Sequence, residues 1–306
     1  MNITTDQKIP ICLVTGFLGA GKTTLLKQIV SDNRDKRLVY IVNEFSPHDI
    51  DGSIVSKENP NVVSIPGGSI FCKCLVTEFI GQLSTIPAEF KGAEGVIIEA
   101  SGMANPKVIA DMLTETKLDQ RYYLAHVVSI VDPGSFLKLC AVLPNITAQI
   151  EASNTIIVNK TDLHDTNTVD STSGAVRKIN PKAQIMTAVN ADIALNLFNP
   201  PAVRTSDLHG DYAKCKDPNY ETITLTISQT VAPHELQQRL TQAENDIYRL
   251  KGPILTTEGP RFLEYTKSGL TLNQIDDAGD RTIVVILRGS PSQSTRSFIA
   301  WLADTQ

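Results

Sequence analysis

One nonapeptide near the N-terminus constrains the fold of this chain more than any other feature. Residues 16–24 read Gly-Phe-Leu-Gly-Ala-Gly-Lys-Thr-Thr and match the pattern G-x-x-x-x-G-K-[ST]. An apolar run precedes them at residues 9–15, and apolar residues follow at helical spacing between residues 25 and 30. A strand, a glycine-rich turn and a helix in this order predict a loop that surrounds phosphate groups with backbone N–H donors.

Each residue type in this loop has a role in binding a nucleoside triphosphate. The glycines allow backbone amides to turn inward, and the helix N-terminus adds further donors and a positive dipole end. Lys22 can reach the β- and γ-phosphates, and the Thr23 hydroxyl can bind Mg²⁺. The residues assigned to the phosphate site are Gly16, Gly19, Ala20, Gly21, Lys22, Thr23 and Thr24.

A second motif indicates the base of the nucleotide. Residues 159–162 read Asn-Lys-Thr-Asp and follow an apolar run at 155–158. The Asp162 carboxylate can accept hydrogen bonds from the guanine N1–H and exocyclic amine, a pair of donors that adenine lacks. Asn159 can bond the guanine edge and tie its loop to the phosphate-binding turn, while the stem of Lys160 can lie over the ring. The motif therefore favours guanine over adenine.

A third segment lies between these two motifs. Residues 96–98 form a continuous apolar run, which is typical of a strand buried on both faces. Glu99 follows it directly, and a carboxylate at the end of the strand beside the phosphate-loop strand usually contacts Mg²⁺ directly or through water. Gly102 would let the backbone approach the γ-phosphate.

Composition and charge limit the class of protein. The 306 residues are 42% hydrophobic and 20% charged, which is ordinary for a globular protein with a sizeable core. The net charge of −5, without a basic stretch, argues against broad nucleic-acid binding. The first eight residues carry no signal-peptide pattern, and no apolar run reaches the ~18 residues of a membrane span. Five cysteines without an export signal predict reduced thiols and a cytoplasmic protein, with Cys12 in the core.

The spacing of apolar runs predicts an α/β fold in the first two thirds of the chain. Strand-like runs alternate with helical stretches, which implies a mainly parallel sheet covered by helices, as in P-loop NTPases. Nucleotide sites in such sheets lie at the carboxyl ends of the strands, where all three motifs fall. The expected strands are near residues 9–15, 38–42, 62–65, 95–98, 125–131, 155–158 and 184–187.

The pattern changes after a polar, turn-rich stretch at residues 199–220, which we interpret as a linker. The predicted domains are a P-loop domain at 1–205 and a small α+β domain with an antiparallel sheet at 206–306. The second domain carries no nucleotide motif. Its expected elements are strands near 223–227, 253–257, 261–265, 270–275 and 282–287, and helices near 233–240 and 292–303.

These motifs together resemble those of the CobW-type GTPases, which are related to HypB and UreG, the metallocentre-assembly GTPases of hydrogenase and urease. The resemblance lies in residues 14–25, in 42–45 with 50–52, in 129–132 and in the pair 251–252, and covers nearly the whole chain. It implies a GTPase domain with a CobW-type C-terminal domain. It also implies binding of GTP or GDP with Mg²⁺, slow hydrolysis, and delivery of a metal or metallocofactor to a client protein.

One departure concerns the metal-binding motif of that family. The family places Cys-x-Cys-Cys after an Asn-Gly pair, whereas residues 66–74 here read Pro-Gly-Gly-Ser-Ile-Phe-Cys-Lys-Cys. Two thiolates, Cys72 and Cys74, remain, and a closed tetrahedral zinc site needs four ligands. Glu44 in the preceding loop, or a client protein, could supply others. Thiolates suit Zn²⁺ or Co²⁺ better than Mg²⁺. The alternative is that both cysteines are packing residues.

The mechanism implied is phosphoryl transfer, in which a protein mainly positions groups and stabilises charge. We assign Lys22, Thr23 and Glu99 to catalysis, and residues 43–51 to a switch segment that the γ-phosphate orders. The sequence places no arginine or glutamine for the attacking water, so turnover should be slow. A homodimer or a client would complete the site.

Three functions are compatible with these features. The first is a GTPase metallochaperone that couples nucleotide state to metal delivery. The second is a GTPase that activates a cofactor-dependent enzyme, for instance a corrinoid one, and carries no metal itself. The third is a nucleotide-dependent scaffold whose small domain is the working surface. Guanine nucleotide is the expected small-molecule partner of all three.

Overall fold

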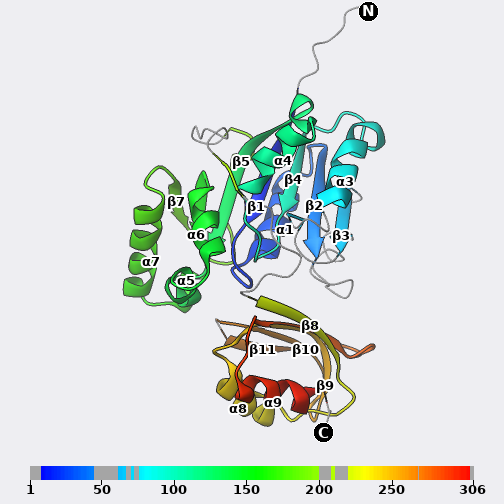
Figure 1. Ribbon diagram of the computed structural model, residues 1–306, viewed down its shortest axis with the longest axis vertical. Coiled ribbons are helices and arrows are strands. Elements are labelled where there is room, and N and C mark those ends of the chain that lie inside the picture. The colour runs from blue at the N-terminus through cyan, green and yellow to red at the C-terminus, as the bar shows by residue number, and fades with distance from the viewer. Residues whose placement is uncertain are drawn as a thin grey trace, which may run out of the picture. The chain divides into compact units, whose positions relative to one another are not determined.

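The computed structural model describes most of the chain, in two compact units, Met1–Cys215 and Lys216–Gln306 (Figure 1). The functional boundary that the sequence placed at residue 205 remains a proposal. The described residues are 8–44, 61–66, 70–71, 76–199, 208–210, 220–267 and 269–303.

The first unit is built on a seven-stranded sheet with the order β3-β2-β4-β1-β5-β6-β7. Every neighbouring pair of strands runs parallel, which confirms the predicted P-loop NTPase class of sheet. The phosphate-loop strand β1 lies in the middle, between β4 and β5. The strands are β1 (Ile9–Thr15), β2 (Leu38–Glu44), β3 (Val62–Pro66), β4 (Gly95–Glu99), β5 (Tyr122–Val131), β6 (Thr155–Val158) and β7 (Gln184–Thr187).

Helices join β1 to β2 and each consecutive pair of strands from β3 to β7, as parallel pairing requires. Pro133 and Pro144 stand at the first position of α5 and α6, where the missing proline N–H costs no helical hydrogen bond. The α-helices are α1 (Lys22–Asp32), α3 (Val76–Glu89), α4 (Val108–Glu115), α5 (Pro133–Cys140), α6 (Pro144–Glu151) and α7 (Thr166–Ile179). Two 3₁₀ turns are η1 (Leu118–Gln120) and η2 (Thr161–Leu163).

The central strands of the first unit's sheet are buried on both faces. Along β1, Ile11 and Leu13 belong to a core cluster that includes side chains of α3 and α4. The alternate residues, Cys12 and Val14, belong to a second cluster with the apolar side chains of α1. Successive side chains of a strand point to opposite faces, so helices cover both sides of β1. This double burial explains why its sequence is a continuous apolar run.

The second unit is a five-stranded antiparallel sheet with the order β11-β10-β9-β12-β8 and two helices. Leu236 and Leu240 of one helix and Phe298 and Leu302 of the other share one core cluster with the sheet. The predicted α+β class is therefore confirmed. The elements are β8 (Tyr220–Thr226), α8 (Pro233–Ala243), β9 (Ile247–Thr256), β10 (Gly259–Thr266), β11 (Gly269–Gln274), β12 (Thr282–Arg288) and α9 (Gln293–Leu302).

One predicted strand of the second unit was wrong in its extent. The strand expected at 253–257 is β9, which begins six residues earlier, at Ile247. Gly252 and Pro253 lie inside it, so the first six residues of the strand, 247–252, were missing from the prediction. Pro253 lies beyond Lys251, the last β9 residue paired with β12, so its missing N–H interrupts no ladder on that side.

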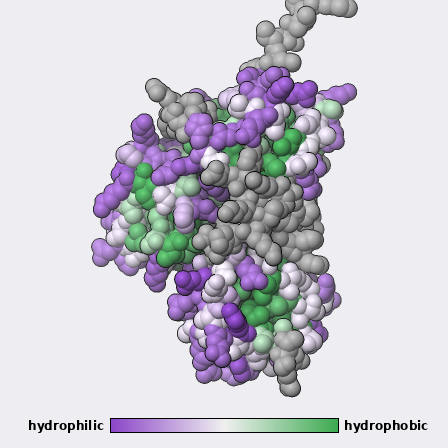
Figure 2. Space-filling model, in the orientation of Figure 1, coloured by the Kyte–Doolittle hydropathy of each residue, from purple (hydrophilic) through white to green (hydrophobic). Residues whose placement is uncertain are grey.

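The surfaces of both units carry mostly hydrophilic residues on the face drawn in Figure 2, with smaller hydrophobic areas between them. None of the helices in the described part of the chain combines the length and the apolar character that crossing a membrane requires.

Candidate nucleotide-binding site

The predicted phosphate loop connects β1 to α1 at the carboxyl edge of the sheet. Gly16 starts it with a backbone φ of +136°, and a Cβ atom there would lie 2.2 Å from the carbonyl oxygen of Ile130 in β5. Only glycine fits that position, because the left-handed region and the contact both exclude a side chain. The first helical turn of α1 has no side-chain cap on its backbone N–H groups. This is the arrangement that an anionic ligand can complete.

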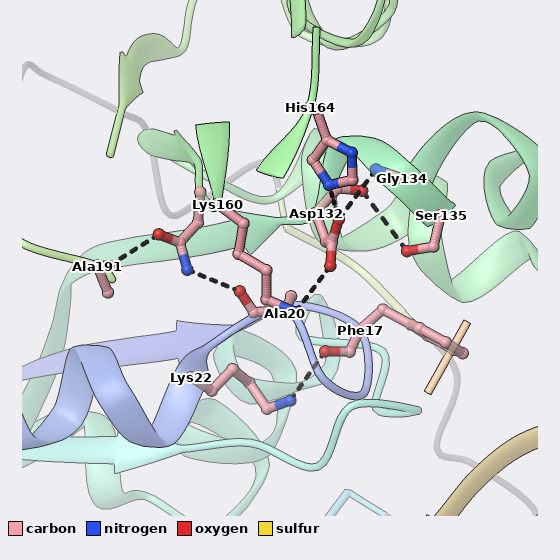
Figure 3. Close-up of polar contacts among 10 residues, drawn as sticks. Phe17, Ala20, Lys22, Asp132, Gly134, Ser135, Lys160, His164 and Ala191 are labelled. Carbon is pink, nitrogen blue, oxygen red and sulfur yellow. Dashed lines mark hydrogen bonds and ion pairs between the residues drawn. The ribbon is translucent and has the colours of Figure 1, made fainter. Parts of the chain in front are cut away.

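Lys22 turns its side chain back into this loop. Its Nζ donates to the carbonyl oxygen of Gly16 at 2.9 Å. It also donates to the carbonyl oxygen of Phe17 at 3.2 Å (Figure 3). The side chain is buried, although it is charged. A buried ammonium group needs partners, and a phosphate oxygen is a stronger acceptor than a neutral carbonyl. Lys22 therefore holds its positive charge at the loop to which the sequence assigned it.

Asn159 joins the second motif to the phosphate loop. Its Nδ2 donates to the carbonyl oxygen of Ala20 at 3.0 Å, and its Oδ1 accepts from the backbone N–H of Ala191 at 2.8 Å. The side chain is buried. Gly21 allows this contact, because its Cβ would lie 2.5 Å from Asn159 Nδ2. The expected tie between the two loops is thus present, across 139 residues of sequence.

Asp162 and Lys160 follow Asn159 at the end of β6. Asp162 lies in η2 and is exposed, so a ligand can reach its carboxylate. Lys160 adopts a left-handed backbone conformation with φ of +58°. Its Nζ donates to Asp132 Oδ2 at 2.8 Å. The head of the lysine is therefore held at the end of β5, while its backbone lies beside Asn159.

Asp132 and His164 complete this contact, and sequence reasoning gave neither of them a role. Asp132 directly follows β5 and caps α5, accepting from the backbone N–H of Gly134 at 2.9 Å. His164 Nε2 lies 3.1 Å from the same carboxylate (Figure 3). One signal could have found Asp132. Like Glu99, it is a carboxylate at the end of a strand that neighbours β1.

Glu99 stands where the sequence placed it, at the end of the strand next to β1. In register it pairs with Val14 of β1 and with Val42 of β2, so it lies one residue before the end of β1. Its side chain is buried. A buried carboxylate at this edge is a suitable ligand for Mg²⁺ or for one of its waters.

The loop after Glu99 is tied to both the phosphate loop and α6. A Cβ on Gly102 would lie 2.7 Å from the backbone nitrogen of Leu18, so the two loops touch through glycine. On the other side, the buried Gln149 of α6 donates to the carbonyl oxygens of Gly102 and Ala104, both at 3.1 Å. Asn145 of the same helix donates to Met103 at 2.8 Å. Three successive carbonyl groups are thus held by one helix.

The predicted transition-metal ligands Cys72 and Cys74 lie outside the described residues, as does the side chain of Glu44. Within the described ranges, no group of three or more His, Cys, Asp or Glu side chains is arranged to hold a metal ion. Cys12 is a core residue, as expected, and burial raises the pKa of its thiol to about 12. It therefore stays protonated and is unsuited to metal binding.

The start of the predicted switch segment contacts the residues just before Cys72. Asn43, near the end of β2, accepts from the backbone N–H of Ile70 at 3.0 Å. Ile70 and Phe71 are fully buried, and Phe71 packs edge-on against Phe79 of α3 at a ring distance of 6.1 Å. The backbone two residues before Cys72 is therefore anchored to the strand that leads into the switch segment. Switch residues 45–51 lie outside the described part.

Comparison with known proteins agrees with this geometry. Residues 10–187 match the sequence model of a family described as CobW/HypB/UreG, nucleotide-binding domain. That range begins in β1 and ends with β7, and it contains the phosphate loop, Glu99 and the motif at 159–162.

Three relatives illustrate the similarity. The zinc-regulated GTPase metalloprotein activator 1 of Dictyostelium discoideum is 27% identical over 233 residues, which cover 62% of this chain and 47% of that protein. The zinc chaperone YjiA of Escherichia coli K12 is 28% identical over 194 residues, covering 62% and 60%. The chain thus aligns with less than two thirds of either protein.

The third relative aligns over almost its full length. The zinc chaperone CobW of a Sinorhizobium species is 24% identical over 345 residues, which cover 96% of this chain and 97% of that protein. Since the family match spans more than half of the 306 residues and includes every nucleotide motif, the chain belongs to the CobW/HypB/UreG family.

Proposed function

We propose that this chain is a GTP-binding and GTP-hydrolysing protein that couples its nucleotide state to delivery of a metal to a client protein. The observation that carries the proposal is the hydrogen bond from Asn159 to Ala20, because it joins the guanine motif and the phosphate loop into one site. Family membership supports nucleotide binding, and the names of the three relatives support a role in zinc handling.

The proposed roles follow the sequence motifs. Phosphate groups would be held by the loop from Gly16 to Thr24, with Gly102 at the γ-phosphate. Guanine would be read by Asn159, Lys160 and Asp162. Mg²⁺ would be held by Thr23 and Glu99 and would neutralise charge on the phosphates. Turnover should be slow, with residues 1–205 forming the nucleotide domain and a homodimer or client completing the site.

The metal would be held near Cys72 and Cys74, with Glu44 as a further ligand. Zinc is favoured over cobalt, because the relatives are named for zinc and two thiolates suit it. The hydrogen bond between Asn43 and Ile70 supports coupling. It connects the first residue of the switch segment to the backbone just before Cys72, so a movement of one segment would displace the other.

The nucleotide preference is the direct test of the guanine site. GTP should bind at least about tenfold more tightly than ATP, because adenine leaves Asp162 without donors, at a cost of ~1–3 kcal/mol. Competition of both nucleotides against a fluorescent GDP measures this ratio. Asp162→Asn should shift the preference toward xanthosine nucleotides, whereas Asp170→Asn, an exposed position on α7, should not. Equal competition by ATP and GTP would reject the assignment.

Zinc binding tests the metal role. The apo protein should bind about one Zn²⁺ per chain and release protons as thiolates form. The affinity should differ between the GDP state and a non-hydrolysable GTP state. Calorimetry should show the site lost in Cys72→Ala/Cys74→Ala and kept in Cys140→Ala, which removes a half-buried free cysteine elsewhere in the same unit.

A second candidate is a GTPase that activates a metalloenzyme without carrying metal. The name of the Dictyostelium relative, a metalloprotein activator, supports this second candidate. Identical zinc titrations of the wild type and the double cysteine variant, with guanine binding intact, would reject metal carriage at these cysteines. Absence of zinc binding in both would leave this activator or a nucleotide-dependent scaffold.

A further inference from the structure

The carboxylate of Asp132 is the centre of a polar network beside the proposed guanine site. Its Oδ2 accepts from Lys160 Nζ at 2.8 Å. Its Oδ1 accepts from Gly134 N at 2.9 Å and lies 3.1 Å from His164 Nε2. A carboxylate only accepts hydrogen bonds, so His164 carries its proton on Nε2 in this contact. Figure 3 shows Asp132 between Lys160 and His164, above the phosphate loop.

Burial separates this ion pair from an ordinary surface pair. The Asp132 side chain is 2% exposed, whereas Lys160 is 23% exposed and His164 is 18% exposed. Exposed pairs constrain their side chains little, but a buried carboxylate that loses a partner is left with unpaired charge. Asp132 is also fixed by its helix-capping bond to Gly134. The lysine therefore has a rigid acceptor at its far end.

Lys160 is held at both ends by these contacts. Its backbone adopts φ of +58°, and its neighbour Asn159 is bonded to Ala20 and to Ala191. Its ammonium group is bonded to Asp132. A free lysine side chain has about four rotatable bonds and loses ~2 kcal/mol of rotamer entropy when ordered. Here the contacts to Asp132 and the bonds of Asn159 hold the side chain in one arrangement.

Gly134 is shaped for the same network. A Cβ at this position would lie 2.6 Å from His164 Cε1, so any side chain would push the imidazole away from Asp132. His164 reaches the carboxylate only because residue 134 is glycine. The histidine contact thus depends on the residues at the end of β5 and the start of α5.

We propose that Asp132 and His164 are positioning residues of the guanine site. They hold the ammonium group of Lys160 so that its alkyl stem lies against the face of the guanine ring, and they act on base affinity without touching the nucleotide. This inference rests on the proposed guanine-binding function. Asp162 would read the edge of the base, while Asp132 and His164 would set contact with its face, which guanine and hypoxanthine share.

The test uses the full chain and compares three ligands, GDP, IDP and inorganic pyrophosphate. Asp132→Asn should lower the affinities for GDP and IDP by the same factor, about tenfold, and should change the affinity for pyrophosphate by less than about twofold. His164→Ala should lower GDP affinity about threefold, and His164→Gln, which keeps a donor, should restore most of it. Competition against a fluorescent GDP gives all of these constants.

A double-mutant cycle separates positioning from general loosening of the fold. In a Lys160→Met background, which keeps the stem and removes the ammonium group, Asp132→Asn and His164→Ala should have no further effect on GDP. Two controls should leave GDP affinity unchanged. His209→Ala removes another His–Asp pair, with Asp111, in the same unit, and Asp165→Ala removes the cap of α7 next to η2.

The outcomes distinguish the two proposals. Two results, obtained with a wild type that binds GDP, would overturn the positioning role alone. One is that the variants lower the affinity for pyrophosphate as much as the affinity for GDP. The other is that they keep their full effect on GDP affinity in the Lys160→Met background. Wild type that binds no guanine nucleotide would overturn the proposed function itself. If Asp132→Asn fails to fold, His164→Ala in the same cycle decides the question.

Discussion

Lys22→Ala should reduce the affinity for GTP by at least about 100-fold and abolish hydrolysis. The ammonium group of Lys22 already lies inside the phosphate loop, 2.9 Å from the carbonyl oxygen of Gly16. It is buried, so the charge acts in a low dielectric, where a hydrogen bond to a phosphate oxygen is strong. One or two such charged contacts, at ~1.5–3 kcal/mol each, account for the expected factor.

Titration with a fluorescent GTP analogue and a phosphate-release assay measure both effects. Lys27→Ala is the matched control, because it removes a lysine from the same helix five residues further on, and it should bind GTP normally. Far-ultraviolet circular dichroism checks that the fold is retained. Turnover of Lys22→Ala close to the wild-type rate would show that the phosphate-loop assignment is wrong.

The parallel sheet was predictable from sequence because burial on both faces leaves a simple signature. The run at 9–15 and the run at 155–158 match β1 and β6 residue for residue. Each is continuous and apolar, since helices cover both sides of the sheet. The motifs at the ends of these strands were predictable for the same reason. Once strand ends are known, parallel topology brings them to one edge.

The network around Asp132 was not predictable in this way. Its partners Lys160 and His164 lie 28 and 32 residues further along the chain, on the loop after the next strand. No periodicity or local motif records such a pairing, because it depends on the order of β5 and β6 in the sheet. His164 also stands in a polar stretch, where most histidines are merely solvated.

The start of β9 was hidden by a local feature of the backbone. Gly252 adopts φ of +149°, and a Cβ there would lie 2.5 Å from the carbonyl oxygen of Thr282. The glycine therefore marks a close approach of two strands, and not the beginning of one. The strand expected at 253–257 therefore lacked residues 247–252, which come before and include this glycine. Only the pairing with β12 reveals its role.

The link between the guanine motif and the phosphate loop makes a second strong prediction. Gly21→Ala should weaken GTP binding about 100-fold. Two effects add. The backbone at φ +114° is strained for alanine by ~1–2 kcal/mol, and the new Cβ would lie 2.5 Å from Asn159 Nδ2. Displacing that amide breaks its bond to Ala20, which costs a further ~1–3 kcal/mol because the group is buried.

The contact between Gly21 and Asn159 can be isolated by combining substitutions. Asn159→Ala alone should lower the affinity for GTP about tenfold, since the hydrogen bond between the two loops is lost. In that background Gly21→Ala no longer meets Asn159 Nδ2 or Cγ, whereas the backbone strain and the ordinary contact of 3.4 Å with Ile130 Cδ1 remain. The second substitution should therefore cost less than it does alone, with a coupling free energy of ~1–3 kcal/mol.

Gly92→Ala serves as the control for backbone strain. Gly92 also has a left-handed φ, of +76°, but the nearest atoms to its Cβ would be those of the flexible Arg37 side chain, at 3.3 Å and beyond. It should lower stability without changing GTP affinity. Effects of Gly21→Ala and Asn159→Ala that add to within ~0.5 kcal/mol would mean that the two residues act independently. The hydrogen bond from Asn159 to Ala20 would then not be what unites the base and phosphate subsites, and the proposed guanine site would lose its structural basis.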